Sequence, residues 1–197
     1  MQRMQAMAVA TVLTVLMSCG AAMGQAHAGT PPTAPPEKAQ ASAPAPTPGP
    51  AAEVQRSYAG VKANVLKSAD KMPEDGFAYK PEPDIRTYAR VINHISETQL
   101  HICGAVNGTA SDALAKVPPE TADKAAIVDA LKASFAECDK AYASVTDTNL
   151  SEVFTLGPVK RSRVGALWGN VSHDNEQYAT LALYLRLKGI APPSSEK

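Results

Sequence analysis

Apolar side chains recur every three or four residues along four stretches of the chain, 53–72, 85–106, 122–145 and 162–188. This spacing places the apolar residues of a stretch on one face of an α-helix. The apolar face of the first stretch consists of Val54, Tyr58, Val61, Val65 and Met72. That of the second consists of Tyr88, Val91, Ile92, Ile95, Ile102 and Val106. That of the third consists of Val128, Leu131, Phe135, Cys138, Tyr142 and Val145. Helices that bury such faces against one another predict an all-α four-helix bundle over residues 53–197.

Residues that start or stop helices stand at the ends of these stretches. Pro73 ends the first stretch, because proline cannot continue a helix. Asp84 precedes the second stretch as a candidate N-cap, and Gly108 follows it as a stop. Thr121 or Asp123 is expected to cap the third helix, since either side chain can accept a hydrogen bond from a free backbone N–H.

The fourth stretch carries His173 at mid-length and ends at Gly189. The basic run 160–163 is interpreted as the solvated start of this helix, and only the segment 152–156 shows a short alternation typical of a strand. Three aromatic side chains of this helix are expected to lie in the core or in a pocket wall: Trp168, Tyr178 and Tyr184.

The N-terminus predicts export from the cytoplasm. A positive start is followed by the apolar run 6–17, which is shorter than the roughly 20 residues that span a membrane. Cleavage after Ala28 would give a signal peptide over residues 1–28. A lipobox-like sequence before Cys19 would instead give a membrane-tethered lipoprotein. Both alternatives place the protein in the periplasm or outside the cell.

Residues 29–52 form a segment rich in proline and alanine, with eight of the chain's 16 prolines. Such a composition cannot bury a core and predicts a disordered linker. The following domain holds 17 Lys and Arg against 18 Asp and Glu residues, so its net charge is close to zero. Without clustered positive charge, the domain is not expected to bind nucleic acid.

Two cysteines fall in the predicted domain, Cys103 near the end of the second helix and Cys138 in the second half of the third. An even pair in an exported protein favours a disulfide, with two buried free thiols as the alternative. In antiparallel helices these cysteines would stand about 22 Å apart, whereas a disulfide needs Cα atoms within about 7 Å. The connection 107–120 is long enough to return the chain and make the two helices parallel. A disulfide therefore implies an up-down-down-up bundle.

Three segments of the chain resemble members of the DinB-like family of four-helix bundles. They are MPEDGFAYKPEPDIRTYARVINHI (72–95), CDKAYASVTD (138–147) and LWGNVSHDNEQYATLALYLRLKGIAPP (167–193). The resemblance covers nearly the whole domain and implies an up-down-down-up fold. In similar proteins, one histidine of the second helix and two of the fourth bind a divalent metal ion such as nickel or zinc.

The resemblance implies a metal site at His94, His173 and Gln177. The two histidines match the family pattern, but glutamine stands where a further histidine is usual. An amide oxygen is a weaker ligand than imidazole for zinc or nickel, so the affinity should fall. Enzymes of the family are thought to transfer thiols or hydrolyse amide bonds, which would make Glu176 or Tyr178 a proton-transfer group here.

Two functions from different classes are compatible with these residues. The first is an exported metal-dependent hydrolase or transferase that acts on a small-molecule substrate. The second is a non-catalytic binding or structural bundle whose metal site was lost with the change to Gln177. In either case contact with a membrane is expected only through a lipid anchor, and a homodimer is one possible assembly. His101 is expected to lie at the surface.

Overall fold

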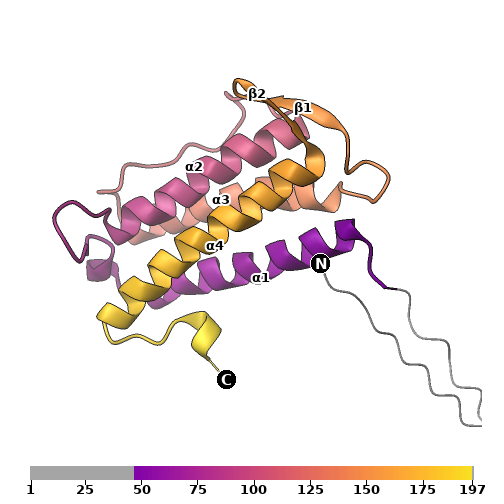
Figure 1. The fold of residues 1–197 in the computed structure, drawn as a ribbon. Coiled ribbons are helices and arrows are strands. Elements are labelled where there is room, and N and C mark those ends of the chain that lie inside the picture. The colour runs from indigo at the N-terminus through magenta and orange to yellow at the C-terminus, as the bar shows by residue number, and fades with distance from the viewer. Residues whose placement is uncertain (1–46, 197) are drawn as a thin grey trace, which may run out of the picture. The chain divides into compact units, whose positions relative to one another are not determined.

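The computed structural model describes residues 47–196, which fold into four α-helices and one β-hairpin (Figure 1). The helices are α1 (Pro50–Lys71), α2 (Tyr88–Asn107), α3 (Lys124–Ala143) and α4 (Arg163–Leu187), the strands are β1 (Val153–Leu156) and β2 (Val159–Ser162), and two short 3₁₀ helices are η1 (Glu74–Gly76) and η2 (Pro193–Ser195). The predicted signal peptide, the Cys19 alternative and most of the predicted linker lie outside the described residues. The last residues of that linker are helical, because α1 begins at Pro50.

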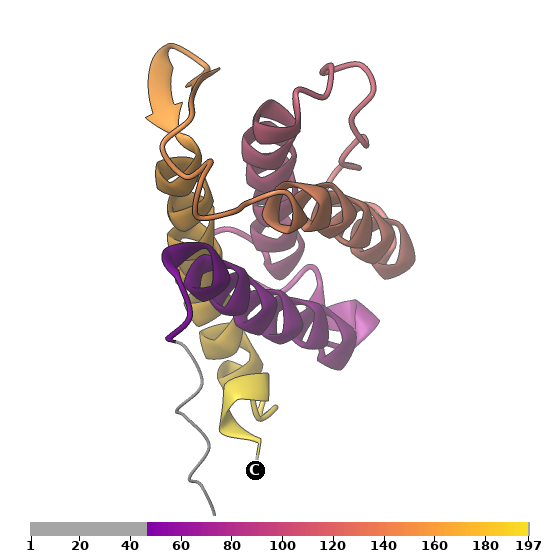
Figure 2. The same ribbon diagram turned by 90° about the vertical axis from the view of Figure 1, so that its right-hand side faces the viewer.

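The four helices form an up-down-down-up bundle, as predicted. α1 packs against α3 and α4, and α2 also packs against α3 and α4, so α1 and α2 lie on a diagonal (Figure 2). Along α2 and α3 the contacts rise together in residue number, from Gln99 with Ser134 to Asn107 with Glu137, so these helices run parallel. α4 runs antiparallel to α2, since Tyr184, near the end of α4, bonds to Arg86, just before the start of α2.

The helix ends follow the sequence signals, with one correction. Asp123 caps α3 by accepting a hydrogen bond from the backbone N–H of Ala126, and Gly108 ends α2 with a positive φ of 68°. The predicted cap at Asp84 is wrong, because Thr87 accepts the hydrogen bond from the N–H of Arg90. The backbone is still extended at Thr87, so α2 begins at Tyr88 and not at Ile85, where the apolar pattern began.

The connection between α3 and α4 contains a β-hairpin, and the sequence pattern indicated only its first strand. The segment 152–156 does hold strand β1, and β2 pairs with it antiparallel, with Phe154 opposite Arg161. The basic run 160–163 is therefore mainly strand, and its interpretation as the start of a helix is wrong except at Arg163. Ser162 caps α4 by accepting from the N–H of Gly165.

The core of the domain lies between the four helices and contains the disulfide. Cys103 and Cys138 are bonded, with Cα atoms 4.9 Å apart, and both side chains are buried. This confirms the predicted pair and the parallel course of α2 and α3. Tyr178 and Tyr184 are buried as expected, whereas Trp168 is 41% exposed, so of the two predicted places the core is wrong for Trp168. None of the helices in residues 47–196 combines the length and apolar character needed to cross a bilayer.

Candidate functional site

His94 of α2 and His173 of α4 meet where these antiparallel helices pack against each other. Their Nε2 atoms lie 3.1 Å apart, and the rings are edge-to-face with centroids 4.9 Å apart. Both residues are half-buried. The apolar pattern alone would have left His173 in solvent, so it is the packing of α4 on α2 that brings the two imidazoles together.

A buried carboxylate holds His173 from the side opposite His94. Oδ1 of Asp174 lies 3.3 Å from Nδ1 of His173, and the Asp174 side chain is fully buried. Its Oδ2 accepts hydrogen bonds from the amides of Gln99 at 2.8 Å and Asn170 at 3.3 Å. These donors compensate part of the free-energy cost of burying a charge.

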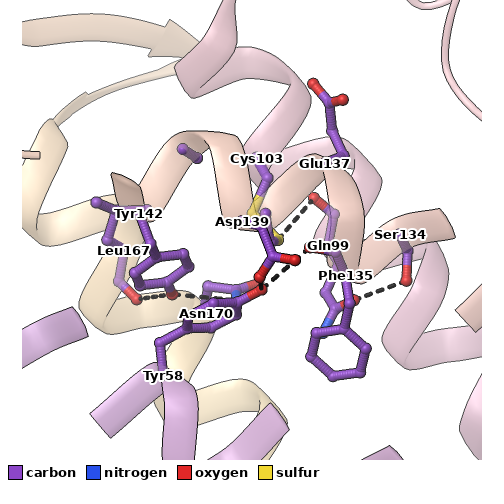
Figure 3. The surroundings of a disulfide bond; sticks show 12 residues. Tyr58, Gln99, Cys103, Ser134, Phe135, Glu137, Asp139, Tyr142, Leu167 and Asn170 are labelled. Carbon is purple, nitrogen blue, oxygen red and sulfur yellow. Dashed lines mark hydrogen bonds between the residues drawn. A yellow bond between two sulfur atoms is a disulfide. The ribbon is translucent and has the colours of Figure 1, made fainter. Parts of the chain in front are cut away.

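A chain of hydrogen bonds continues from this carboxylate into the core. Ser134 of α3 donates to the amide oxygen of Gln99 at 2.7 Å, which fixes the amide nitrogen toward Asp174. Figure 3 shows Gln99, Ser134 and Asn170 around the disulfide, and the Cys138 sulfur lies 3.8 Å from the backbone oxygen of Gln99. Three helices thus contribute to the orientation of His173.

The contact with Asp174 determines which nitrogen of His173 is free. A carboxylate accepts a proton donor, so Nδ1 of His173 carries hydrogen and Nε2 presents its lone pair to His94. Two nitrogen lone pairs at 3.1 Å repel each other unless a proton or a cation lies between them. The pair is therefore either a hydrogen bond from His94 to His173 or one side of a metal site.

The distance between the imidazoles fits a shared divalent ion. Metal–nitrogen bonds of about 2.0–2.1 Å place two nitrogens about 3.1 Å apart when the angle at the metal is about 100°, within the usual range for zinc. Burial lowers the pKa of His94, and the positive charge of Arg86 lowers it further. A lowered pKa keeps the imidazole neutral near pH 7, the state in which it binds metal. Burial raises the pKa of Asp174, against hydrogen bonds from His173 and Gln99 that lower it.

Few side chains near the two histidines could serve as a third metal ligand. Gln177 lies one turn after His173 on α4 and is 7% exposed, and Oγ1 of Thr98 lies 3.4 Å from Nε2 of His173. Within residues 47–196, no three His, Cys, Asp or Glu side chains cluster in a way that could hold a metal ion. A third protein ligand would therefore be the Gln177 amide or the Thr98 hydroxyl.

Two further candidates follow His173 on α4. Glu176 is exposed, and the Tyr178 hydroxyl accepts a hydrogen bond from the backbone N–H of Ser194 in the C-terminal segment. The Tyr178 hydroxyl is therefore engaged with Ser194, and a proton-transfer role of Glu176 stays a prediction. His101 is exposed, as expected.

The contacts of Asp174, Gln99 and Thr98 around the histidine pair were not predicted from the sequence. Their signal was available in part, because Gln99 falls between Ile95 and Cys103 on the apolar face of α2. A polar side chain at such a position must find a buried partner. Which partner it finds could not be read from spacing, because Asp174 is 75 residues away.

Comparisons with known proteins agree with this fold. The chain matches the family described as the DinB superfamily over residues 57–181. It is similar to the crystal structure of a DinB-like protein from Bacillus cereus, with a TM-score of 0.59 and 18% identity over 71% of this chain and 93% of that chain. A DinB-like protein from Bacillus subtilis is similar with a TM-score of 0.55 and 14% identity, over 70% and 92% of the two chains. No curated protein matches the sequence.

Proposed function

Because the chain belongs to the DinB superfamily, we propose that it binds a divalent metal ion, nickel or zinc, at His94, His173 and Gln177. We further propose that it is a metal-dependent hydrolase or transferase with a small-molecule substrate. The observation that carries the proposal is the 3.1 Å approach of two imidazole nitrogens from different helices. The contact of His173 with a buried carboxylate supports it, since metal-binding histidines usually donate their second N–H to such a group.

Each residue of the proposed metal site has its own role. His94 and His173 would hold the ion, which as a Lewis acid lowers the pKa of a bound water or thiol. Asp174 keeps Nδ1 of His173 protonated and its ring in place. Gln177 would complete the ligand set or orient a water with its amide. The packed core behind Asp174 excludes water from that side of the histidine pair.

We also propose that the protein is exported and lies in the periplasm or outside the cell. It would be released by cleavage after residue 28 or anchored at Cys19. The Cys103–Cys138 disulfide supports this location, because disulfides persist in oxidising compartments and are rare in the cytoplasm.

A non-catalytic bundle is the second candidate, and one observation favours it. A proton on Nε2 of His94 satisfies the histidine pair without any metal, as the 3.1 Å distance also fits a hydrogen bond. With glutamine at position 177, such a pair could persist as a structural contact between α2 and α4.

Elemental analysis of the protein, purified without a metal-affinity column, distinguishes a metal-binding protein from a non-catalytic bundle without metal. Near-stoichiometric nickel or zinc that is lost in His173→Ala would support the metal site and justify a substrate screen. His101→Ala is the matched control, because His101 is an exposed histidine on the same helix as His94. A native protein that stays metal-free in the presence of added ions, while Gln177→His binds them, would favour the non-catalytic bundle.

A further inference from the structure

The Cys103–Cys138 disulfide lies one helical turn beyond the contact between Gln99 and Ser134 (Figure 3). Gln99 and Cys103 are four residues apart on α2. Ser134 and Cys138 are four residues apart on α3, so each pair shares one face of its helix. All four side chains are buried. The covalent bond and the hydrogen bond are therefore neighbouring links between the same faces of α2 and α3.

The hydroxyl of Ser134 has two acceptors within reach but only one hydrogen to donate. Its Oγ lies 2.7 Å from the amide oxygen of Gln99 and 2.8 Å from the backbone oxygen of Leu131 in its own helix. Donation to Leu131 needs no second helix, whereas donation to Gln99 needs α2 and α3 at their present distance. A small separation of the two helices would therefore turn the hydroxyl to Leu131 and release the Gln99 amide.

The disulfide prevents this separation. It joins α2 to α3 with the Cα atoms of Cys103 and Cys138 4.9 Å apart, and a disulfide keeps such atoms within about 7 Å. The Cys138 sulfur also lies 3.8 Å from the backbone oxygen of Gln99, so the bond is placed directly beside the residue whose amide it would hold.

Release of the Gln99 amide would reach His173 through Asp174. Gln99 donates to Oδ2 of Asp174 at 2.8 Å, the shorter of the two amide hydrogen bonds that this oxygen accepts. Oδ1 of the same carboxylate lies 3.3 Å from Nδ1 of His173, which is already longer than most N–H···O hydrogen bonds. A small shift of the carboxylate would therefore break its contact with the imidazole.

We propose that the disulfide and Ser134 position the metal site through Gln99. They hold its amide against Asp174, which in turn holds His173 toward His94. The metal affinity of the histidine pair then depends on the oxidation of the two cysteines, and the site reaches its full affinity in the oxidised protein. The inference rests on the proposed function for the metal ion, and it adds the regulation of that site.

A double-mutant cycle on the full chain tests whether the disulfide and Ser134 act through one route. The variants are Cys103→Ala/Cys138→Ala, Ser134→Ala and the combination of both. Alanines replace the cysteines because free thiols would bind zinc themselves. Met72→Ala is the control, since it truncates a buried side chain after the end of α1 and lowers stability without removing any of these hydrogen bonds.

Competition with a chromogenic chelator measures zinc affinity without denaturant, where circular dichroism shows each variant folded. We expect oxidised wild type and Met72→Ala to bind zinc alike. Ser134→Ala and the cysteine variant should each bind it about tenfold more weakly, and the combination no more weakly than either alone. Unchanged affinity in the cysteine variant, an equal loss in Met72→Ala, or losses that multiply to about 100-fold in the combination would overturn the inference.

The tautomer of His173 provides a readout that needs no metal. Nitrogen NMR of the metal-free protein, at a pH where the rings are neutral, distinguishes hydrogen on Nδ1 from hydrogen on Nε2. We expect His173 to carry hydrogen on Nδ1 in wild type and in Met72→Ala, because Asp174 accepts it. Ser134→Ala and the cysteine variant should show a mixture of both tautomers. An unchanged tautomer in these two variants would contradict the positioning role.

The two readouts separate this inference from the metal site itself. If wild type binds zinc and the Ser134→Ala and cysteine variants bind it equally well, the positioning role is wrong and the metal site stands. If wild type binds no zinc, the metal site is wrong. A tautomer change that requires both the disulfide and Ser134 then still supports the positioning of His173.

Discussion

The side-chain amide of Gln99 donates a 2.8 Å hydrogen bond to the fully buried carboxylate of Asp174. This contact joins α2 to α4 directly behind the histidine pair. It also explains how a carboxylate is tolerated in the core, since Gln99 is itself fixed by Ser134. The network contains the groups whose replacement should separate folding from metal binding.

Asp174→Asn should weaken metal binding more than it weakens folding. The amide still fills the space but no longer accepts the Nδ1 proton of His173 with a full negative charge. Loss of such a second partner typically lowers metal affinity about 10–100-fold. Competition with a chromogenic chelator measures the change, and Asp129→Asn on the exposed face of α3 is the control. Unchanged affinity in Asp174→Asn would show that the carboxylate does not orient the ligand.

Asp174→Ala should destabilise the fold, because it leaves the amide donors of Gln99 and Asn170 without their shared acceptor. Each unpaired buried donor costs about 1–3 kcal/mol, so loss of the acceptor of both should lower the free energy of unfolding by about 2–6 kcal/mol. Urea denaturation measures it. A loss below about 0.5 kcal/mol would mean that water replaces the carboxylate at little cost.

Removal of the disulfide should lower stability while the bundle stays folded. Cys103 and Cys138 are 35 residues apart in sequence, and a cross-link of this kind contributes about 2–4 kcal/mol. We therefore expect the Cys103→Ala/Cys138→Ala variant to unfold at lower urea than the oxidised protein, with the same helical circular dichroism. The wild type with reductant should match the variant. If reductant and mutation each leave the midpoint unchanged, the bond contributes nothing to stability.

Glu137 should make stability depend on acid pH. Burial by itself would raise its pKa, but hydrogen bonds from Asn107, Lys140 and Thr109 lower it from 4.5 to about 2. A folded-state pKa below the unfolded value stabilises the fold above about pH 4.5, and this stabilisation is lost as the pH falls toward 2. The shift corresponds to at most about 3 kcal/mol.

The measurement is the free energy of unfolding between pH 6 and about pH 2 for wild type and Glu137→Gln. The glutamine variant should be less stable near neutral pH and should lose less stability in acid. Glu120→Gln, at an acidic residue bonded to the Thr87 hydroxyl, is the comparison. Parallel pH profiles for wild type and Glu137→Gln would contradict the prediction.

Thr87→Ala should destabilise α2 by about 1 kcal/mol, because the Arg90 N–H loses its N-cap acceptor. Asp84→Ala is the matched control, since Asp84 was the cap that the apolar pattern suggested and the structure places the cap at Thr87. Thermal unfolding monitored by circular dichroism compares the two. A larger loss in Asp84→Ala than in Thr87→Ala would contradict the assignment.

Much of the bundle could be predicted because its signals are local. Apolar spacing identified all four helices, and Asp123 and Gly108 marked ends through their own backbone and side-chain chemistry. The prediction was wrong where two local signals competed, as with Asp84 and Thr87. It also missed β2, because the exposed basic residues of that strand show no alternation of burial.

The candidate site was predictable only by resemblance, and then only in part. His94 and His173 were expected together, and the structure brings their Nε2 atoms to 3.1 Å. Whether Gln177 joins them in binding a metal stays a prediction. The contact of the Asp174 carboxylate with Nδ1 of His173 was not predicted, because a helical wheel does not show which buried group a carboxylate contacts.

The sequence by itself determined the helices, their order and the cysteine pair, since apolar spacing and chain length act over short distances. Only the tertiary structure decided that Asp174 contacts His173 and that Gln99, itself held by Ser134, contacts Asp174. The physical reason is that these contacts depend on how far each helix is rotated and shifted against its neighbours. That rotation is the outcome of packing all four apolar faces at once, and no single stretch of sequence contains it.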